Sequence, residues 1–218
     1  MFNIKPLENL INIYENTIKT LNIEIEAAED IKNFDEIKLL NRKLEKTKTL
    51  YLLVLLEHMD EIIHMINNDE EEITKIHEID FDKIMYNIYE INFTSTEAIR
   101  LMKSWMMYIS TLNRYSSKLT SIEYILLNAS IIQHSQVISD ILVRAECHDV
   151  FNYRHKLWGN IIPLQKKNEI INNIMSPVYG IIMLFLNNPE KFNYYDIQKN
   201  VITISDYIAD KTMDAIEV

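Results

Sequence analysis

The chain has 218 residues, 48% of them hydrophobic, and a formal net charge of −10. It holds only two glycines, which excludes a glycine-rich phosphate loop or dinucleotide fingerprint and disfavours a sheet protein with many tight turns. Its single cysteine excludes a disulfide framework or a multi-cysteine zinc site within one chain. We therefore predict an all-α fold, a bundle of about eight helices.

Two apolar stripes run along residues 4–66, each with alternating spacings of three and four residues. Such spacing places a stripe on one face of a helix, as in helices that pack lengthwise. Pro6 suits the first turn of a helix that runs to about Asp30, and only residues 32–34 remain for a reversal. We predict a long antiparallel hairpin whose stripes are formed by Ile4, Leu7, Ile11, Tyr14, Ile18, Leu21, Ile25 and Ala28, and by Ile37, Leu40, Leu44, Thr47, Tyr51, Val54, His58, Ile62 and Met65.

The second hairpin helix carries its own start signal and an unusually apolar middle. We expect Asp35 to cap a helix over about residues 36–66, with Phe34 packed on Leu39 as a hydrophobic staple. Residues 50–56 are apolar on every side of a helix, so we expect the rest of the protein to pack against them.

Shorter helices follow the hairpin. Residues 73–92 predict one or two of them, with Asp80 or Asp82 as a possible cap. Thr94 and Glu97 fit a capping box, in which each residue satisfies an amide of the other at the start of a helix that ends near residue 118. The predicted core face of that helix consists of Ala98, Met102, Trp105, Ile109 and Leu112.

A second capping box, Thr120 with Glu123, predicts a single helix over residues 121–150, followed by an irregular segment over 151–163. The expected core face of this helix consists of Ile125, Ala129, Ile132, Ile138, Ile141 and Ala145.

The last third of the chain predicts three helices. The first covers residues 164–175. Ser176 followed by Pro177 predicts a new helix to about residue 187, nearly all apolar and therefore expected at the centre of the core. Asn193 is the expected cap of a final helix to about Ile216, with Ile197, Val201, Ile204, Ile208 and Ala215 on one face. We predict one continuous domain, in which residues 1–68 form the hairpin and residues 69–218 the helical core.

Charge is distributed unevenly along the chain. Residues 1–98 hold 21 acidic and 10 basic residues, whereas residues 99–167 hold nine basic and four acidic ones. An acidic hairpin thus precedes a mildly basic middle. Solvated helix faces account for such a pattern, and so does a surface that steers a charged partner.

Methionines and aromatic residues cluster in the helix that follows Thr94. Methionine is flexible and polarisable, and such side chains form adaptable binding grooves. At helical spacing they also form core faces, but five consecutive apolar residues put part of the cluster on a second face. We predict a partner-binding face that contains Met102, Trp105, Met106 and Tyr108.

An enzymatic alternative rests on the cluster of reactive side chains between residues 144 and 156. Helical ribonucleases of the HEPN type use an arginine and a histidine separated by four to six residues, whereas only three separate Arg144 from His148. In this alternative Arg144, His148 and His155 act on RNA. Cys147 would need a base to serve as nucleophile, and His148 diverges from it as the next residue on a helix.

A metal-binding helical bundle is a further alternative. Ferritin-like di-iron sites require two Glu-x-x-His motifs, one on each of two helices. The chain contains one, Glu61 to His64, and Glu24 on the first hairpin helix is a possible additional ligand. A transition-metal site from Cys147, His148 and His155 would lack a fourth ligand.

We predict a non-enzymatic protein that binds another protein, or a second copy of itself, as an adaptor, regulator, inhibitor or structural subunit, without a cofactor. Its negative charge disfavours duplex nucleic acid as a partner. Its apolar runs are too short for a membrane span, and the first twenty residues lack the apolar core of a signal peptide. These features and the single cysteine predict a cytoplasmic, reducing location, and the abundance of isoleucine and asparagine fits an AT-rich genome.

Overall fold

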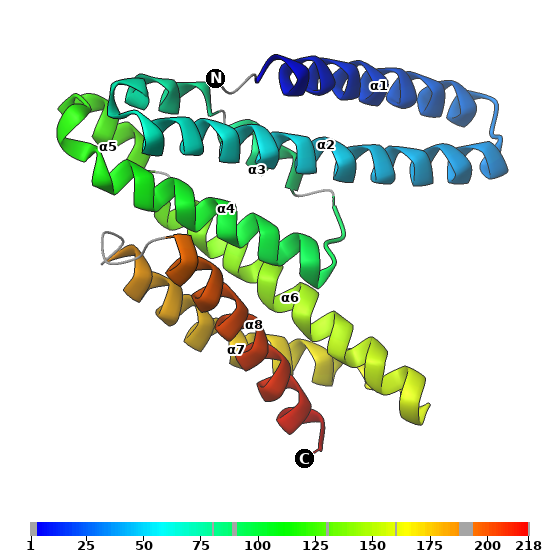
Figure 1. Ribbon diagram of the computed structural model, residues 1–218. Coiled ribbons are helices and arrows are strands. Elements are labelled where there is room, and N and C mark those ends of the chain that lie inside the picture. The colour runs from blue at the N-terminus through cyan, green and yellow to red at the C-terminus, as the bar shows by residue number, and fades with distance from the viewer. Residues whose placement is uncertain are drawn as a thin grey trace. The chain divides into compact units, whose positions relative to one another are not determined.

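The protein is all-α in the computed structural model (Figure 1), which describes residues 4–79, 81–88, 91–129, 131–159, 161–187 and 194–217. Among these residues no helix has the length and apolar character needed to cross a membrane. The chain divides into two compact units, residues 1–91 and 92–218. The elements are α1 (Lys5–Asp30), α2 (Phe34–Asn68), the 3-10 helix η1 (Glu70–Glu78), α3 (Phe81–Ile88), α4 (Ser95–Arg114), the 3-10 helix η2 (Ser116–Lys118), α5 (Ser121–Ala129), α6 (Ile131–Trp158), α7 (Leu164–Leu186) and α8 (Tyr194–Glu217).

The predicted N-terminal hairpin is confirmed. Helices α1 and α2 lie side by side, and Pro6 occupies the first turn of α1 (Figure 1). Every residue of the two predicted stripes is buried or half-buried. Near the reversal the two stripes form a small core of Leu21, Ala28, Leu40 and Leu44, flanked by Ile18, Ile25 and Ile37. Lys32 makes the reversal with φ at +55°, a left-handed conformation in which only glycine is free of steric cost.

The predicted start of α2 is wrong by two residues. Asn33 is the cap: its side-chain oxygen accepts from the amide of Glu36 at 3.4 Å, and its Nδ2 donates to the Glu36 carboxylate at 2.7 Å. Phe34 is therefore the first helical residue rather than the residue before a cap. It is 75% exposed and Leu39 is 54% exposed, so the expected staple does not form.

The second half of α2 is the core of the first unit, and η1 and α3 pack against it. Most of residues 50–56 are buried or half-buried, although Leu50 is exposed. A polar contact ties three helices together: the Tyr51 hydroxyl on α2 donates to Glu15 on α1 at 2.8 Å, and Lys83 on α3 ion-pairs with Glu15. The hydrogen bond from Lys83 holds the pKa of Glu15 below its usual value.

The region after the hairpin contains one 3-10 helix and one short α-helix, in agreement with the prediction for residues 73–92. Asp82 is the second residue of α3 rather than its cap. The alternative cap, Asp80, lies outside the described residues.

Both predicted capping boxes are confirmed in the second unit. The amide of Thr94 donates to Glu97 Oε2 at 2.9 Å, and the amide of Glu97 donates to Thr94 Oγ1 at 3.4 Å. Thr120 and Glu123 exchange the same two bonds at 2.7 and 3.3 Å. The predicted core face of α4 is buried in full.

The described residues between 121 and 150 are helical as predicted, in α5 and α6, and Ser130 between them lies outside the described residues. The predicted end of this helix near residue 150 is wrong, because α6 continues to Trp158 through part of the segment predicted to be irregular. Ile138 and Ala145 are buried as expected, but Ile125 and Ile132 are exposed. The predicted core face is therefore buried only in part.

Helix α6 is the centre of the second unit, because α4, α5, α7 and α8 all pack against it. The predicted centre at residues 177–187 is wrong. It belongs to α7, a continuous helix with Pro177 inside it and with Ile181 and Leu184 exposed. Pro177 itself is exposed, so its ring displaces no core side chain, and one missing amide bond did not end the helix.

Four of the five residues predicted on the α8 face are buried and Ala215 is half-buried, while Asn193 lies outside the described residues.

Candidate functional site

The four side chains predicted to form a partner-binding face are closed to solvent. Met102, Trp105, Met106 and Tyr108 are each at most 3% exposed. The Trp105 indole donates from Nε1 to Ser135 Oγ on α6 at 2.9 Å, stacks on Tyr108 and meets His134 edge-on. The expectation of an open face at these residues is therefore corrected: the cluster is core, because α4 is buried around nearly its whole circumference.

The three residues of the ribonuclease alternative share one face of α6 but do not converge. Arg144 and His155 are eleven residues apart, about 16 Å along a helix axis. The Arg144 Nε donates to both carboxylate oxygens of Asp140, at 2.7 and 2.9 Å, and these bonds raise the pKa of the guanidinium. His148 lies edge-on to Phe151, and its exposed ring is separate from His155. The structure thus shows no hydrogen bond, ion pair or ring contact among these three residues.

Cys147 is fully buried, and its sulfur lies 3.2 Å from Thr212 Oγ1 on α8. Burial raises the pKa of the Cys147 thiol, which opposes formation of the nucleophilic thiolate. The thiol therefore packs as a small apolar group between α6 and α8.

The neighbouring Glu146 is a buried carboxyl group that sequence reasoning left out. Its Oε1 accepts a 2.6 Å hydrogen bond from the Ser205 hydroxyl on α8. Burial raises the pKa of Glu146 against the opposing effect of this bond, and the nearby charges of Asp149 and Asp206 act in the same direction as burial.

Replacing Glu146 with glutamine is expected to stabilise the protein at pH 7. Because the folded-state pKa is raised, the folded chain binds this proton more tightly than the unfolded chain, so the stability contributed by Glu146 falls as the pH rises from 4.5 through the folded pKa. Glu146→Gln keeps the acceptor for Ser205 and removes the charge. Melting temperatures of both proteins between pH 4 and pH 8 test this, with Glu169→Gln, the same change at an exposed glutamate of α7, as the control. A difference that stays constant over that range would contradict a buried, titrating Glu146.

The half-motif of the metal alternative lies near the end of α2. Glu61 is half-buried, and His64 is exposed with its ring 3.3 Å from the Asn68 amide nitrogen. Within the described residues no three His, Cys, Asp or Glu side chains lie close enough together to hold a metal ion. Glu61 and His64 therefore gain no third ligand there.

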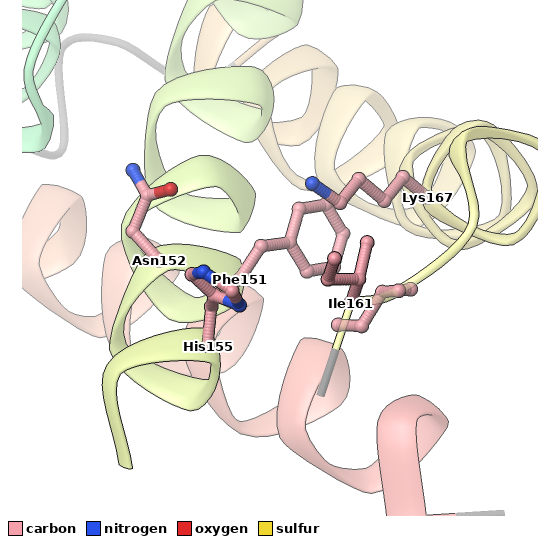
Figure 2. A pocket seen from close by; sticks show the side chains of 6 residues that line it. Phe151, Asn152, His155, Ile161 and Lys167 are labelled. Carbon is pink, nitrogen blue, oxygen red and sulfur yellow. The ribbon is translucent and has the colours of Figure 1, made fainter. Parts of the chain in front are cut away.

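A different site emerges where α6 ends and α7 begins. Gly159 ends α6 with φ at +65° and donates its amide to the carbonyl of His155 at 2.9 Å, and Pro163 precedes the first residue of α7. This turn places the start of α7 against the last turns of α6. Between them lies a pocket of about 230 Å³, lined by Phe151, Asn152, His155, Ile161, Ile162 and Lys167 (Figure 2).

Five large apolar side chains of the last turns of α6 and the residues after it, up to the start of α7, are exposed. Their exposed fractions range from 52% to 81%, far above those of the core. We call this set the Trp158 surface: it consists of Tyr153, Leu157, Trp158, Ile161 and Leu164.

The Trp158 surface has a basic setting. Residues 151–167 contain four lysines and arginines and no acidic residue. The guanidinium of Arg154 lies 4.0 Å from the centre of the Trp158 ring and donates to Glu217 on α8 at 3.2 Å. Among the residues predicted from the sequence as functional, His155 alone lines the pocket. The residues of the Trp158 surface were not predicted, because the predicted helix ended near residue 150, although the dense run of aromatic and basic residues after it was a usable signal.

Comparisons with protein-family models, with curated proteins and with solved structures found no match to this chain.

Proposed function

We propose that this chain is a non-enzymatic protein-interaction protein that binds a protein partner through the Trp158 surface. The observation that carries the proposal is that five large apolar side chains within residues 153–164 are each more than half exposed. Exposed apolar groups that gather in one place are typical of protein interaction sites, whereas scattered ones are common on any surface. Tryptophan, tyrosine and arginine are also the residues that most often dominate binding energy.

The setting of Trp158 supports this role. Arg154 lies against the indole on one side and holds Glu217 on the other, so the ring is fixed by a cation–π contact that is itself anchored to α8. A side chain fixed before binding loses less conformational entropy when a partner covers it. A tryptophan that is held in place and still half-exposed therefore fits an anchor of an interface.

The charge around the surface indicates the kind of partner. A segment with four basic side chains and no acidic one attracts an acidic surface and speeds the encounter with it. The partner that fits is a protein, either a different one or a second copy of this chain, that presents apolar pockets or side chains within an acidic rim. The acidic first unit gives a second copy such a rim.

Substitution of Trp158 tests the proposal. The protein is first purified gently from its own source, and native mass spectrometry identifies the chains bound to it. We expect Trp158→Ala to weaken the binding of that partner by roughly 30-fold, the effect of losing an interface residue worth about 2 kcal/mol. Tyr195→Ala, which removes an exposed aromatic residue from α8, is the matched control and is expected to bind normally.

Two results would contradict the proposal. One is a protein that is monomeric and free of other chains in every preparation from its source. The other is a partner whose affinity, measured by calorimetry, is the same for the wild type, Trp158→Ala and Tyr195→Ala.

A further inference from the structure

The pocket shares Ile161 with the Trp158 surface and is lined by both apolar and polar side chains. Phe151, Ile161 and Ile162 form the apolar part, and Phe151 is almost completely buried. Figure 2 shows Lys167 reaching from α7 toward the Phe151 ring, with His155 on the side of α6. The Lys167 ammonium lies 5.4 Å from the centre of that ring. A few polar groups placed around an apolar cavity are typical of small-molecule sites.

The polar side chains of the pocket are not engaged by the protein. Among the residues that the structure describes, Asn152, His155 and Lys167 have no side-chain hydrogen bond or ion pair, and the ring of Phe151 is the one contact recorded for the Lys167 ammonium. All three can donate: the ammonium has three donors, the amide two, and a neutral imidazole one. Lys167 also lies in the first turns of α7, where the helix dipole favours an anion.

We propose that this pocket binds a small organic carboxylate. Donors on three side chains match a group that only accepts hydrogen bonds, and one lysine matches one negative charge. A phosphate dianion would bring a second charge that no other permanent cation of the pocket offsets. The pocket, of about 230 Å³, has room for a small ligand such as a carboxylate joined to one ring or a short branched chain. The ring or branched chain of such a ligand packs on Phe151, Ile161 and Ile162.

This inference concerns a different ligand from the protein partner proposed above and does not depend on it. The free acid needs no partner chain, so binding of an acid to the purified protein tests the pocket alone.

The experiment compares two probes of the same shape, phenylacetate and its neutral counterpart phenylacetamide, by calorimetry and saturation-transfer NMR on the full chain. We expect phenylacetate to bind with a Kd of about 1 mM, ordinary for ten heavy atoms, and phenylacetamide to bind about ten-fold more weakly. Lys167→Gln is expected to weaken phenylacetate binding about five-fold and to leave phenylacetamide unchanged. The matched control Lys166→Gln removes the neighbouring charge, which does not line the pocket, and is expected to bind as the wild type does.

Three results would overturn the proposal in variants that circular dichroism shows to be folded. These are equal affinity for the acid and the amide, an equal loss in the two lysine variants, and the absence of saturable phenylacetate binding up to about 20 mM, well above the expected Kd.

Discussion

Replacing Trp105 with alanine is expected to lower the free energy of unfolding of residues 92–218 by about 3–5 kcal/mol, the range for a large aromatic side chain removed from a core. The indole is 1% exposed and fills the space between Tyr108 on its own helix and His134 on α6. Alanine leaves a cavity there, and it also deprives the buried Ser135 hydroxyl of its donor.

The other tryptophan of the chain is the natural control. Trp158 is half-exposed and its contact with Arg154 is a cation–π interaction at the surface, so we expect Trp158→Ala to change the free energy of unfolding by about 1 kcal/mol or less. Trp105→Phe separates the two contributions, since it keeps a ring in the core and removes the hydrogen bond, at an expected cost of about 1–2 kcal/mol. Urea unfolding followed by circular dichroism measures all three. Equal losses for Trp105→Ala and Trp158→Ala would show that Trp105 is not part of the core.

The hairpin and both capping boxes could be predicted from the sequence because their determinants are local. A stripe at spacings of three and four residues fixes a helix face without reference to the rest of the chain. The capping box at Thr94 involves groups only three residues apart, so the two residue types at that spacing are enough to predict its hydrogen bonds.

The wrong predictions concern segments whose structure depends on packing against other helices of the chain. Pro177 signals a helix start, but it lies inside α7, because packing on one face of a long helix outweighs one missing hydrogen bond. The apolar run around Trp105 predicted a second, open face, yet it is closed on nearly all sides. No pattern within α4 distinguishes a face that binds a partner from a face that neighbouring helices of the same chain already cover.

The candidate site shows the same limit. Phe151 and Lys167 are sixteen residues apart and belong to different helices, and they meet because α6 and α7 pack against each other. The basic excess between residues 99 and 167 was visible in the sequence. Its position beside exposed aromatic rings depends on α6 extending to Trp158. That extension places Arg154 and His155 on a helix, whereas the prediction had put them in an irregular segment.

Replacing Leu40 with alanine is expected to open the turn end of the hairpin. This part of α1 and α2 has a core of only four fully buried residues, so each of them carries a large share of its stability. Truncating a buried leucine costs about 2–3 kcal/mol where the surroundings can partly collapse, and that loss corresponds to a roughly 30- to 160-fold faster amide hydrogen exchange through local opening.

Leu39→Ala is the matched control for Leu40→Ala, because the two leucines are adjacent in α2 and differ in burial. Leu39 is 54% exposed and Leu40 is 5% exposed. Hydrogen exchange read by mass spectrometry should accelerate over residues 18–44 in Leu40→Ala, remain unchanged over residues 92–218, and change little anywhere in Leu39→Ala. If Leu39→Ala accelerated exchange as much as Leu40→Ala, the two stripes would not face each other, and the antiparallel hairpin would be wrong. If neither variant had an effect, the hairpin near Lys32 would be held by something other than its apolar stripes.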